Sequence, residues 1–237
     1  TSNPQKIVSA FDKSDFIYVR EHLAKKYLEN LGVRQKIYTA PDIVTIINQI
    51  FPEAILREHY IPINLPDTVN GDKKLLIFQC NFINSEVEAK KIIKNLNLLK
   101  DRYTVMLMPA AFSHNDHLYL QYLANEGNLS YFHPNSVFDM VYMLARSDFI
   151  ISTSMHFAIT AFSYTKPFVV YSKNMIKIDE FLAISNISSL FKISDWLDLS
   201  NRVAQIEQFY ADGGVNKISE AYNTSVKNIH DVLKKIN

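Results

Sequence analysis

The segment from Arg146 to Lys173 constrains the fold more than any other part of the chain. An apolar run at 149–151 predicts a buried strand, and a helix of small and apolar residues begins near His156. The turn between them carries three hydroxyl side chains: Ser152, Thr153 and Ser154. Pro167 then precedes a second apolar run. In open α/β sheets such a turn faces the ligand crevice, and backbone N–H groups at a helix start favour anions. The segment therefore predicts an anion-binding turn with a titratable imidazole beside it.

Apolar runs alternate with segments of helical period along most of the chain. We expect strands at 16–19, 36–39, 75–80, 104–108, 129–132, 149–151 and 168–171. We expect helices at 21–31, 42–50, 85–99, 114–125 and 136–146, with Ser85 and Ser136 as N-caps and capping boxes completed by Glu88 and Asp139. From Asp179 to the end the chain reads as helical, mainly at 193–210 and 215–235. This alternation predicts βαβ units, a parallel sheet and an α/β fold.

The pattern fails between Phe51 and Asp72, where three prolines and an Asn-Gly-Asp turn predict an inter-domain linker. We therefore divide the chain into 1–66, the end of a first α/β domain plus linker, 67–190, a second α/β domain, and 191–237, C-terminal helices. The first part is too short for a whole domain. Since the chain also opens on Thr1 rather than Met, we expect a piece of a longer protein.

Composition excludes several classes of protein. A formal net charge of +1 gives no electrostatic footprint for nucleic acid. The 5 glycines form neither GxGxxG nor GxxxxGK[ST], which argues against a dinucleotide or P-loop site. The one cysteine, Cys80, lies in an apolar run and reads as a buried thiol. No apolar stretch reaches the ~20 residues that span a bilayer, and no signal peptide is visible, so we expect a cytoplasmic protein.

Three stretches carry a resemblance to a known family. They are IISTSMHFAITAFSYTKPFVVYSK at 150–173, FIYVREHLAKKYLENLGV at 16–33 with Thr39–Asp42 after it, and the strand 106–108 followed by Pro109 and Asp116. Taken in their order along the chain, they resemble motifs of the polysaccharide pyruvyl transferase family. The resemblance implies two Rossmann-like domains of the B-type glycosyltransferase kind, the first incomplete in this chain, with the active site between them.

The resemblance also implies a reaction. The enolpyruvyl carbon of phosphoenolpyruvate would pass to two hydroxyls of a sugar or lipid-linked oligosaccharide, giving a pyruvate ketal of a surface polysaccharide and releasing phosphate. No cofactor is implied, and the lack of a nucleotide in the donor agrees with the missing Gly-rich loop. The reaction needs cations for the phosphate and carboxylate and a general acid/base.

The candidate residues each have a functional interpretation and a structural alternative. His156 would shuttle protons, or it would be an inert histidine packed between domains. Arg20 would grip the phosphate or carboxylate of the donor, or it would form a surface ion pair with Glu21 or Asp15.

The remaining candidates would contact the phosphate. Ser152, Thr153 and Ser154 would offer hydroxyls to it, although at least one of them would cap the following helix. Many family members carry arginine where Ser154 stands, and Lys173 could supply that charge or be a solvated lysine. Asp116 would bind substrate. Its neighbours His114 and His117 also suggest a metal site, but no further ligand cluster accompanies them, so no metal is assigned.

Two other functions stay open. A glycosyltransferase on the same scaffold would use a nucleotide-sugar and would grip its ribose with an acidic residue, for which Asp179 or Glu180 could serve. A non-catalytic homologue would bind a glycan or a partner protein.

Overall fold

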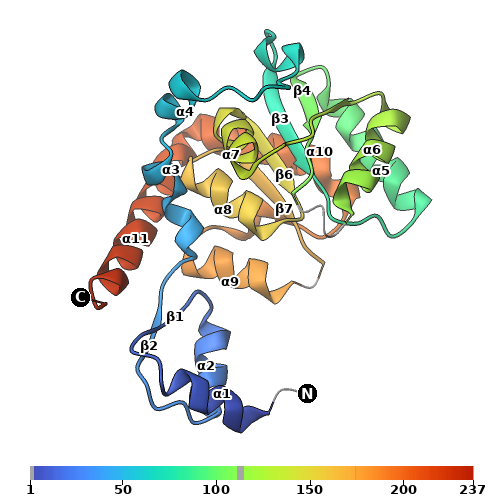
Figure 1. Cartoon of the computed structure of the whole chain (residues 1–237). Helices are drawn as coiled ribbons and strands as arrows, with labels where there is room; N and C mark the ends of the chain where they lie inside the picture. Colours follow the sequence, from blue (N-terminus) through green and yellow to red (C-terminus); the bar gives the residue numbers. More distant parts are fainter. Residues whose placement is uncertain (1–2, 111–114, 174, 237) are drawn as a thin grey trace.

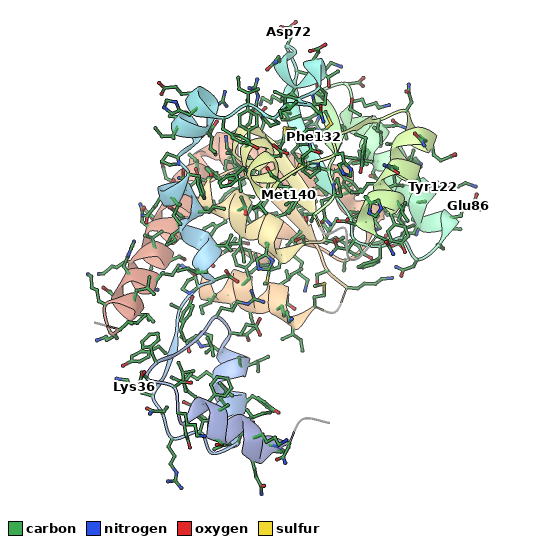
Figure 2. The ribbon with its side chains drawn as sticks, viewed as in Figure 1. Lys36, Asp72, Glu86, Tyr122, Phe132 and Met140 are labelled. Atoms are coloured by element: carbon green, nitrogen blue, oxygen red, sulfur yellow. The ribbon has the colours of Figure 1, made fainter. Side chains whose placement is uncertain are left out.

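The computed structural model describes residues 3–110, 115–173 and 175–236. A small N-terminal unit lies below a larger α/β part (Figure 1). The unit contains helix α1 (Pro4–Phe11), strand β1 (Ile17–Val19), helix α2 (His22–Asn30) and strand β2 (Ile37–Thr39). Its two strands pair in parallel. Figure 2 adds the side chains to the same view, in which the exposed Lys36 belongs to the N-terminal unit.

The larger part is built on one parallel sheet with the strand order β5-β4-β3-β6-β7-β8. The strands are β3 (Lys74–Gln79), β4 (Tyr103–Leu107), β5 (Ser130–Tyr131), β6 (Phe149–Ser152), β7 (Phe168–Tyr171) and β8 (Lys192–Ile193). The α-helices are α3 (Ile47–Ile50), α4 (Glu53–His59), α5 (Glu86–Leu99), α6 (Asp116–Gly127), α7 (Val137–Arg146), α8 (Met155–Ser163), α9 (Ile176–Ile184), α10 (Leu199–Phe209) and α11 (Val215–Leu233). Short 3-10 turns include η1 (Ile43–Ile46), η2 (Asp67–Asn70), η4 (Ser189–Phe191) and η5 (Trp196–Asp198), and a wider turn, η6 (Tyr210–Gly214), joins α10 to α11.

The strand order reverses direction between β3 and β6. From β3 the chain moves outward to β4 and β5, and from β6 it moves the opposite way to β7 and β8. Because parallel crossovers are right-handed, α5 and α6 cover one face of the sheet and α8 and α9 the other. The contacts agree, since α5 packs on α6 and α10 while α8 packs on α7 and α9. The carboxyl ends of β3 and β6 therefore form the topological switch point, where ligands bind in open α/β sheets.

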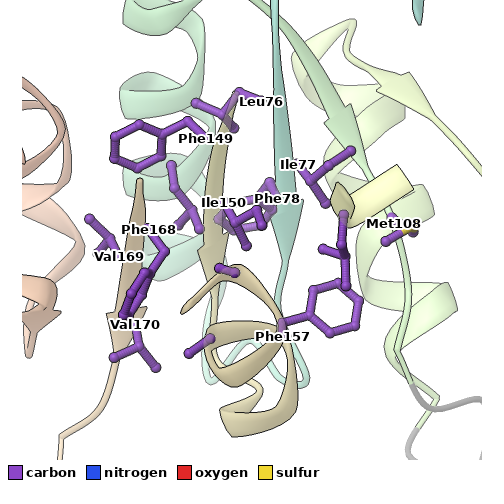
Figure 3. Close-up of a cluster of buried hydrophobic side chains, with 14 of the residues drawn as sticks. Leu76, Ile77, Phe78, Met108, Phe149, Ile150, Phe157, Phe168, Val169 and Val170 are labelled. Atoms are coloured by element: carbon purple, nitrogen blue, oxygen red, sulfur yellow. The ribbon is translucent and has the colours of Figure 1, made fainter. Parts of the chain in front are cut away.

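The core lies on both faces of the central strands. Apolar side chains of β3, β6 and β7 are completely or almost completely buried, among them Ile77, Phe78, Ile150 and Phe168 (Figure 3). Burial on both sides explains why these strands read as continuous apolar runs rather than alternating ones.

Most of the predicted elements are confirmed. All seven predicted strands form, and the capping box of α7 is present, with Ser136 and Asp139 each accepting from the other's backbone. In α5, Ser85 accepts from Glu88 N at 3.2 Å as expected, but the Glu88 carboxylate accepts from Asn84 instead of Ser85, so that half of the predicted box is wrong.

Two predictions of regular structure were wrong, and one helix was missed. The predicted linker contains α4 and η2, because Pro52 can precede a helix and the buried side chain of Leu56 anchors α4 on the core. The start predicted for a helix at 193 belongs instead to strand β8, which is too short to show periodicity and forms by pairing with β7. Helix α1 was not predicted. The predicted division into 1–66, 67–190 and 191–237 stays a prediction.

Cys80 follows β3 and is completely buried, as predicted. Burial raises the pKa of its thiol to about 12. The Sγ donates to the Phe82 carbonyl oxygen at 2.7 Å. The unfolded chain releases this proton near the ordinary thiol pKa, so the contribution of Cys80 to stability is complete below about pH 8.5 and is lost as the pH rises toward 12. We expect no reaction with an aromatic disulfide reagent at pH 8 in the native protein, and one equivalent after denaturation. Rapid labelling of the native protein would contradict this burial.

Candidate functional site

The first two residues of the candidate site come from the ends of the two N-terminal strands. Arg20 directly follows β1, and Asp42 lies three residues beyond the end of β2. Because β1 and β2 are parallel with Val19 opposite Thr39, both residues leave the same edge of this small sheet. Asp42 is fixed further as the N-cap of η1, where its Oδ1 accepts from Val44 N at 3.0 Å.

The third residue comes from the larger part of the chain. His156 is the second residue of α8, directly after the turn that follows β6. Strand β6 lies at the topological switch point of the sheet. The site therefore joins the carboxyl ends of strands from the N-terminal unit and from the larger sheet.

These three side chains are in mutual contact. The Arg20 Nη1 donates to Asp42 Oδ2 and lies 3.3 Å from His156 Nε2, while Asp42 Oδ2 lies 3.8 Å from the same imidazole nitrogen. The Asp42 side chain is only 9% exposed, whereas Arg20 is 33% and His156 56% exposed. A guanidinium has only donors, so Nε2 can accept from Arg20 when unprotonated and can face Asp42 when protonated. The imidazole thus has a partner in both protonation states and an open side toward solvent.

Neighbouring groups shape the charge of this cluster. Burial alone would lower the pKa of Arg20, but the hydrogen bond and charge of Asp42, with a contribution from Glu21, raise it above its ordinary value. The Tyr18 hydroxyl donates to the Pro41 carbonyl oxygen, and burial together with the charge of Asp42 raises its pKa to about 12. Arg20 therefore stays a cation and Tyr18 stays neutral throughout the physiological range.

The predicted hydroxyl residues lie in the turn before α8. Ser152 and Thr153 are buried, and both donate to Gln79 Oε1, at 2.7 and 3.4 Å. Ser154 is partly exposed and occupies the N-cap position of α8 without a capping hydrogen bond from its side chain. Ser154 therefore does not cap the helix with its own hydroxyl, whereas Ser152 Oγ accepts from the backbone N–H of Ser154 at 2.8 Å. Their contact with phosphate stays a prediction, for which Ser154 is the most accessible of the three.

Lys173 and Asp116 lie outside the Arg20–Asp42–His156 cluster. Lys173 is exposed and lines a separate pocket of about 220 Å³ with Lys91, Glu88 and residues near the end of β7 and the start of η5. Asp116 begins α6, is completely buried and accepts from Ala110 N at 2.6 Å. Its predicted substrate contact stays a prediction.

The three residues of this cluster lie within the match to a known protein family. The family model described as polysaccharide pyruvyl transferase matches residues 2–174, which include Arg20, Asp42 and His156. The chain belongs to the polysaccharide pyruvyl transferase family. A search of curated proteins finds no match.

Solved structures show the same fold at low identity. They include a glycosyltransferase from Rickettsia africae ESF-5 (14% identity, TM-score 0.57, 99% of this chain and 66% of that chain). UDP-GlcNAc 2-epimerase from Neisseria meningitidis, bound to UDP-GlcNAc, aligns with 16% identity and a TM-score of 0.56, over 94% of this chain and 61% of its own. Anabaena HepE, in complex with UDP and glucose, aligns with 12% identity and a TM-score of 0.54, over 98% and 65%. The chain thus spans slightly less than two thirds of these neighbours. They confirm an α/β fold with a parallel sheet, consistent with the Rossmann-like domains of B-type glycosyltransferases.

The described part of the chain was also compared with what a metal site and a membrane-spanning helix require. Within residues 3–110, 115–173 and 175–236, no group of three or more His, Cys, Asp or Glu side chains is placed to hold a metal ion. His114, which suggested a metal site beside Asp116, lies outside the described residues. None of the helices in the described part of the chain combines the length and apolar character needed to cross a membrane.

Sequence reasoning missed Asp42 as a member of the site. The Thr39–Asp42 stretch was part of the family resemblance, but Asp42 itself was interpreted only as the start of a helix. Its position after a parallel strand neighbouring that of Arg20 is a signal that could have found it, since both strands end at one sheet edge.

A second contact joins the two parts of the chain near the site. Glu180 of α9 accepts from the backbone N–H of His22 at 2.9 Å, and the N-cap residue of α2, Glu21, makes no capping bond of its own. We expect Glu180→Ala to speed amide hydrogen exchange in the first turn of α2 roughly fivefold, because one hydrogen bond of about 1 kcal/mol is lost. Exchange mass spectrometry checks this. Asp179→Ala, which removes the pair with Lys192 instead, is the control, and equal effects of both variants would contradict the assignment.

Proposed function

We propose that this chain transfers the pyruvyl group of phosphoenolpyruvate to two hydroxyls of a polysaccharide sugar, forming a pyruvate ketal. The observation that carries the proposal is the Arg20–Asp42–His156 cluster within the family match over residues 2–174. The sugar acceptor can be free or lipid-linked, and the proposal places the reaction in the cytoplasm.

The chemistry requires two proton transfers. A sugar hydroxyl adds to C2 of the enolpyruvyl group while C3 gains a proton and becomes a methyl group. A second hydroxyl of the sugar then displaces phosphate from C2, and its proton leaves with the phosphate, so that one ketal and one phosphate result from one donor. His156, partly exposed and contacting both Arg20 and Asp42, is the group that takes and returns these protons in the proposal.

The donor carries a phosphate and a carboxylate, so the site needs positive charge. Arg20 Nη1 lies 3.3 Å from His156 Nε2, and its guanidinium can bind either anion with its planar donor fork. The pocket lined by Arg20, Asp42 and residues of α8 and α9 measures only about 10 Å³, so the proposal places the substrate on the side where His156 is exposed. Ser154 and the first turn of α8 are next to His156 in the sequence. In the proposal the Ser154 hydroxyl and the backbone N–H groups of this turn donate to the phosphate, with Lys173 as a second cation.

A nucleotide-sugar glycosyltransferase is the second candidate, favoured by the UDP-containing complexes among the structural neighbours. The acidic residues that could grip a ribose both have other partners, however. Asp179 pairs with Lys192 at 2.5 Å, and Glu180 accepts from His22 N. This engagement weakens the alternative, and a non-catalytic binding role is the outcome if neither donor is used.

The test follows a label in the donor. The chain is incubated with phosphoenolpyruvate carrying ¹³C at C3 and a panel of hexosides and N-acetylhexosaminides, and carbon NMR is recorded. We expect a ketal methyl signal together with one equivalent of phosphate. Release of labelled pyruvate alone, or sugar transfer to the same acceptors when UDP-sugars replace phosphoenolpyruvate, would overturn the proposal.

A further inference from the structure

Gln79 is the last residue of strand β3 and follows an apolar run at 75–78. Its side chain is completely buried, and it lies opposite Ser152 in the parallel pairing of β3 with β6. These two strands form the topological switch point of the sheet. A buried amide at this position needs partners for its donors and its acceptor, because an unsatisfied one is costly.

The carbonyl oxygen of Gln79 binds the turn that leads to His156. Its Oε1 accepts from Ser152 Oγ at 2.7 Å and from the backbone N–H of Ser154 at 3.1 Å. The same backbone N–H also lies 2.8 Å from Ser152 Oγ. Ser154 is the N-cap of α8, and it has no capping bond from its own side chain. Gln79 therefore holds the backbone from which the first turn of α8 begins.

The amide nitrogen of Gln79 binds two other loops. Its Nε2 donates to Asn81 Oδ1, in the loop after β3, and to Asp116 Oδ2 at 3.4 Å, at the start of α6. Asn81 in turn contacts the turn after β6, because its backbone N–H donates to Thr153 Oγ1 at 2.8 Å. One side chain thus ties together the loops that follow β3, β4 and β6.

We propose that Gln79 is a positioning residue that sets the direction of the first turn of α8 and thereby places His156 against Arg20 and Asp42. Its role in turnover rests on the proposed function. Its amide offers an acceptor to the turn and two N–H donors, one each for Asn81 and Asp116. A methionine fills a similar volume but offers neither strong acceptor nor donor.

The test compares Gln79→Met with Asn95→Leu. Asn95 is also a buried amide of the larger part, where its Oδ1 accepts from Ser200 Oγ at 2.7 Å and joins α5 to α10. Both variants lose buried hydrogen bonds, so both should lose some stability. We expect kcat of Gln79→Met, per folded molecule, to fall roughly 10- to 100-fold with KM for phosphoenolpyruvate changed less than about threefold, because a displacement near 1 Å can cost that much in rate. Asn95→Leu should leave both constants unchanged.

A second readout does not depend on turnover. The imidazole signals of His156 in a ¹⁵N-labelled chain are assigned by their absence in His156→Gln. They should shift in Gln79→Met and stay in place in Asn95→Leu. Should Gln79→Met not fold, Ser152→Ala removes the hydroxyl that bridges Gln79 Oε1 and Ser154 N and should shift the same signals. Unmoved His156 signals in these variants would overturn the inference, whereas a wild-type chain that does not use phosphoenolpyruvate would overturn the proposed function alone.

Discussion

His156→Gln is expected to lower kcat for pyruvyl transfer by about 10²–10⁴-fold, the usual contribution of a positioned acid/base group. Glutamine occupies a similar volume and can still accept from Arg20, but it cannot carry a proton between the sugar hydroxyl and C3 of the donor. Because His156 is 56% exposed, the fold should tolerate the change. Phosphoenolpyruvate should still bind, within about threefold of the wild-type affinity, since the anion contacts remain.

The matched control is His59→Gln. His59 is the last residue of α4 and is exposed at 64%, so it shares the chemistry of His156 but not its neighbours. Its replacement should leave kcat and KM unchanged. If His156→Gln retained wild-type kcat, the proton-transfer role of His156 would be wrong.

Arg20→Ala is expected to weaken the binding of phosphoenolpyruvate roughly 10- to 100-fold, which corresponds to about 1.4–2.8 kcal/mol for the loss of charge-assisted hydrogen bonds. The thermal midpoint should also fall, because the almost buried Asp42 carboxylate loses its ion-pair partner. Arg20→Lys keeps the charge but not the planar fork, so its affinity should lie between the two. Calorimetric titration measures all three proteins.

Arg34→Ala tests whether any arginine of the N-terminal unit has the same effect. Arg34 is exposed and lies outside the Arg20–Asp42–His156 cluster, in a surface pocket beside α1. It should not change the affinity. Equal losses in Arg20→Ala and Arg34→Ala would indicate general electrostatic attraction rather than a specific anion contact.

The fold could be predicted largely from local signals. The runs of β3, β6 and β7 are buried on both faces, so their sequence alone marks them as strands, and the alternation with helices fixes the parallel sheet. Strand β8 and helix α4 could not be predicted in this way. The first exists because β7 offers a partner, and the second because Leu56 reaches the core, so both depend on tertiary contacts.

The candidate site was predicted only in part. Arg20 and His156 could be predicted because a guanidinium and an imidazole follow shortly after predicted strands. The structure brings these two side chains together. Asp42 and Gln79 were missed because their roles depend on which strands lie side by side. Asp42 contacts Arg20 only since β1 and β2 pair, and Gln79 meets the turn at Ser152 only since β3 pairs with β6.

The most direct test of the account is calorimetric titration of the wild-type chain with phosphoenolpyruvate and, separately, with UDP-GlcNAc. Neither measurement requires knowledge of the acceptor sugar. We predict saturable binding of phosphoenolpyruvate that inorganic phosphate competes away, and no binding of UDP-GlcNAc. Binding of UDP-GlcNAc without any binding of phosphoenolpyruvate would contradict the assignment of Arg20 and its neighbours to a pyruvyl donor.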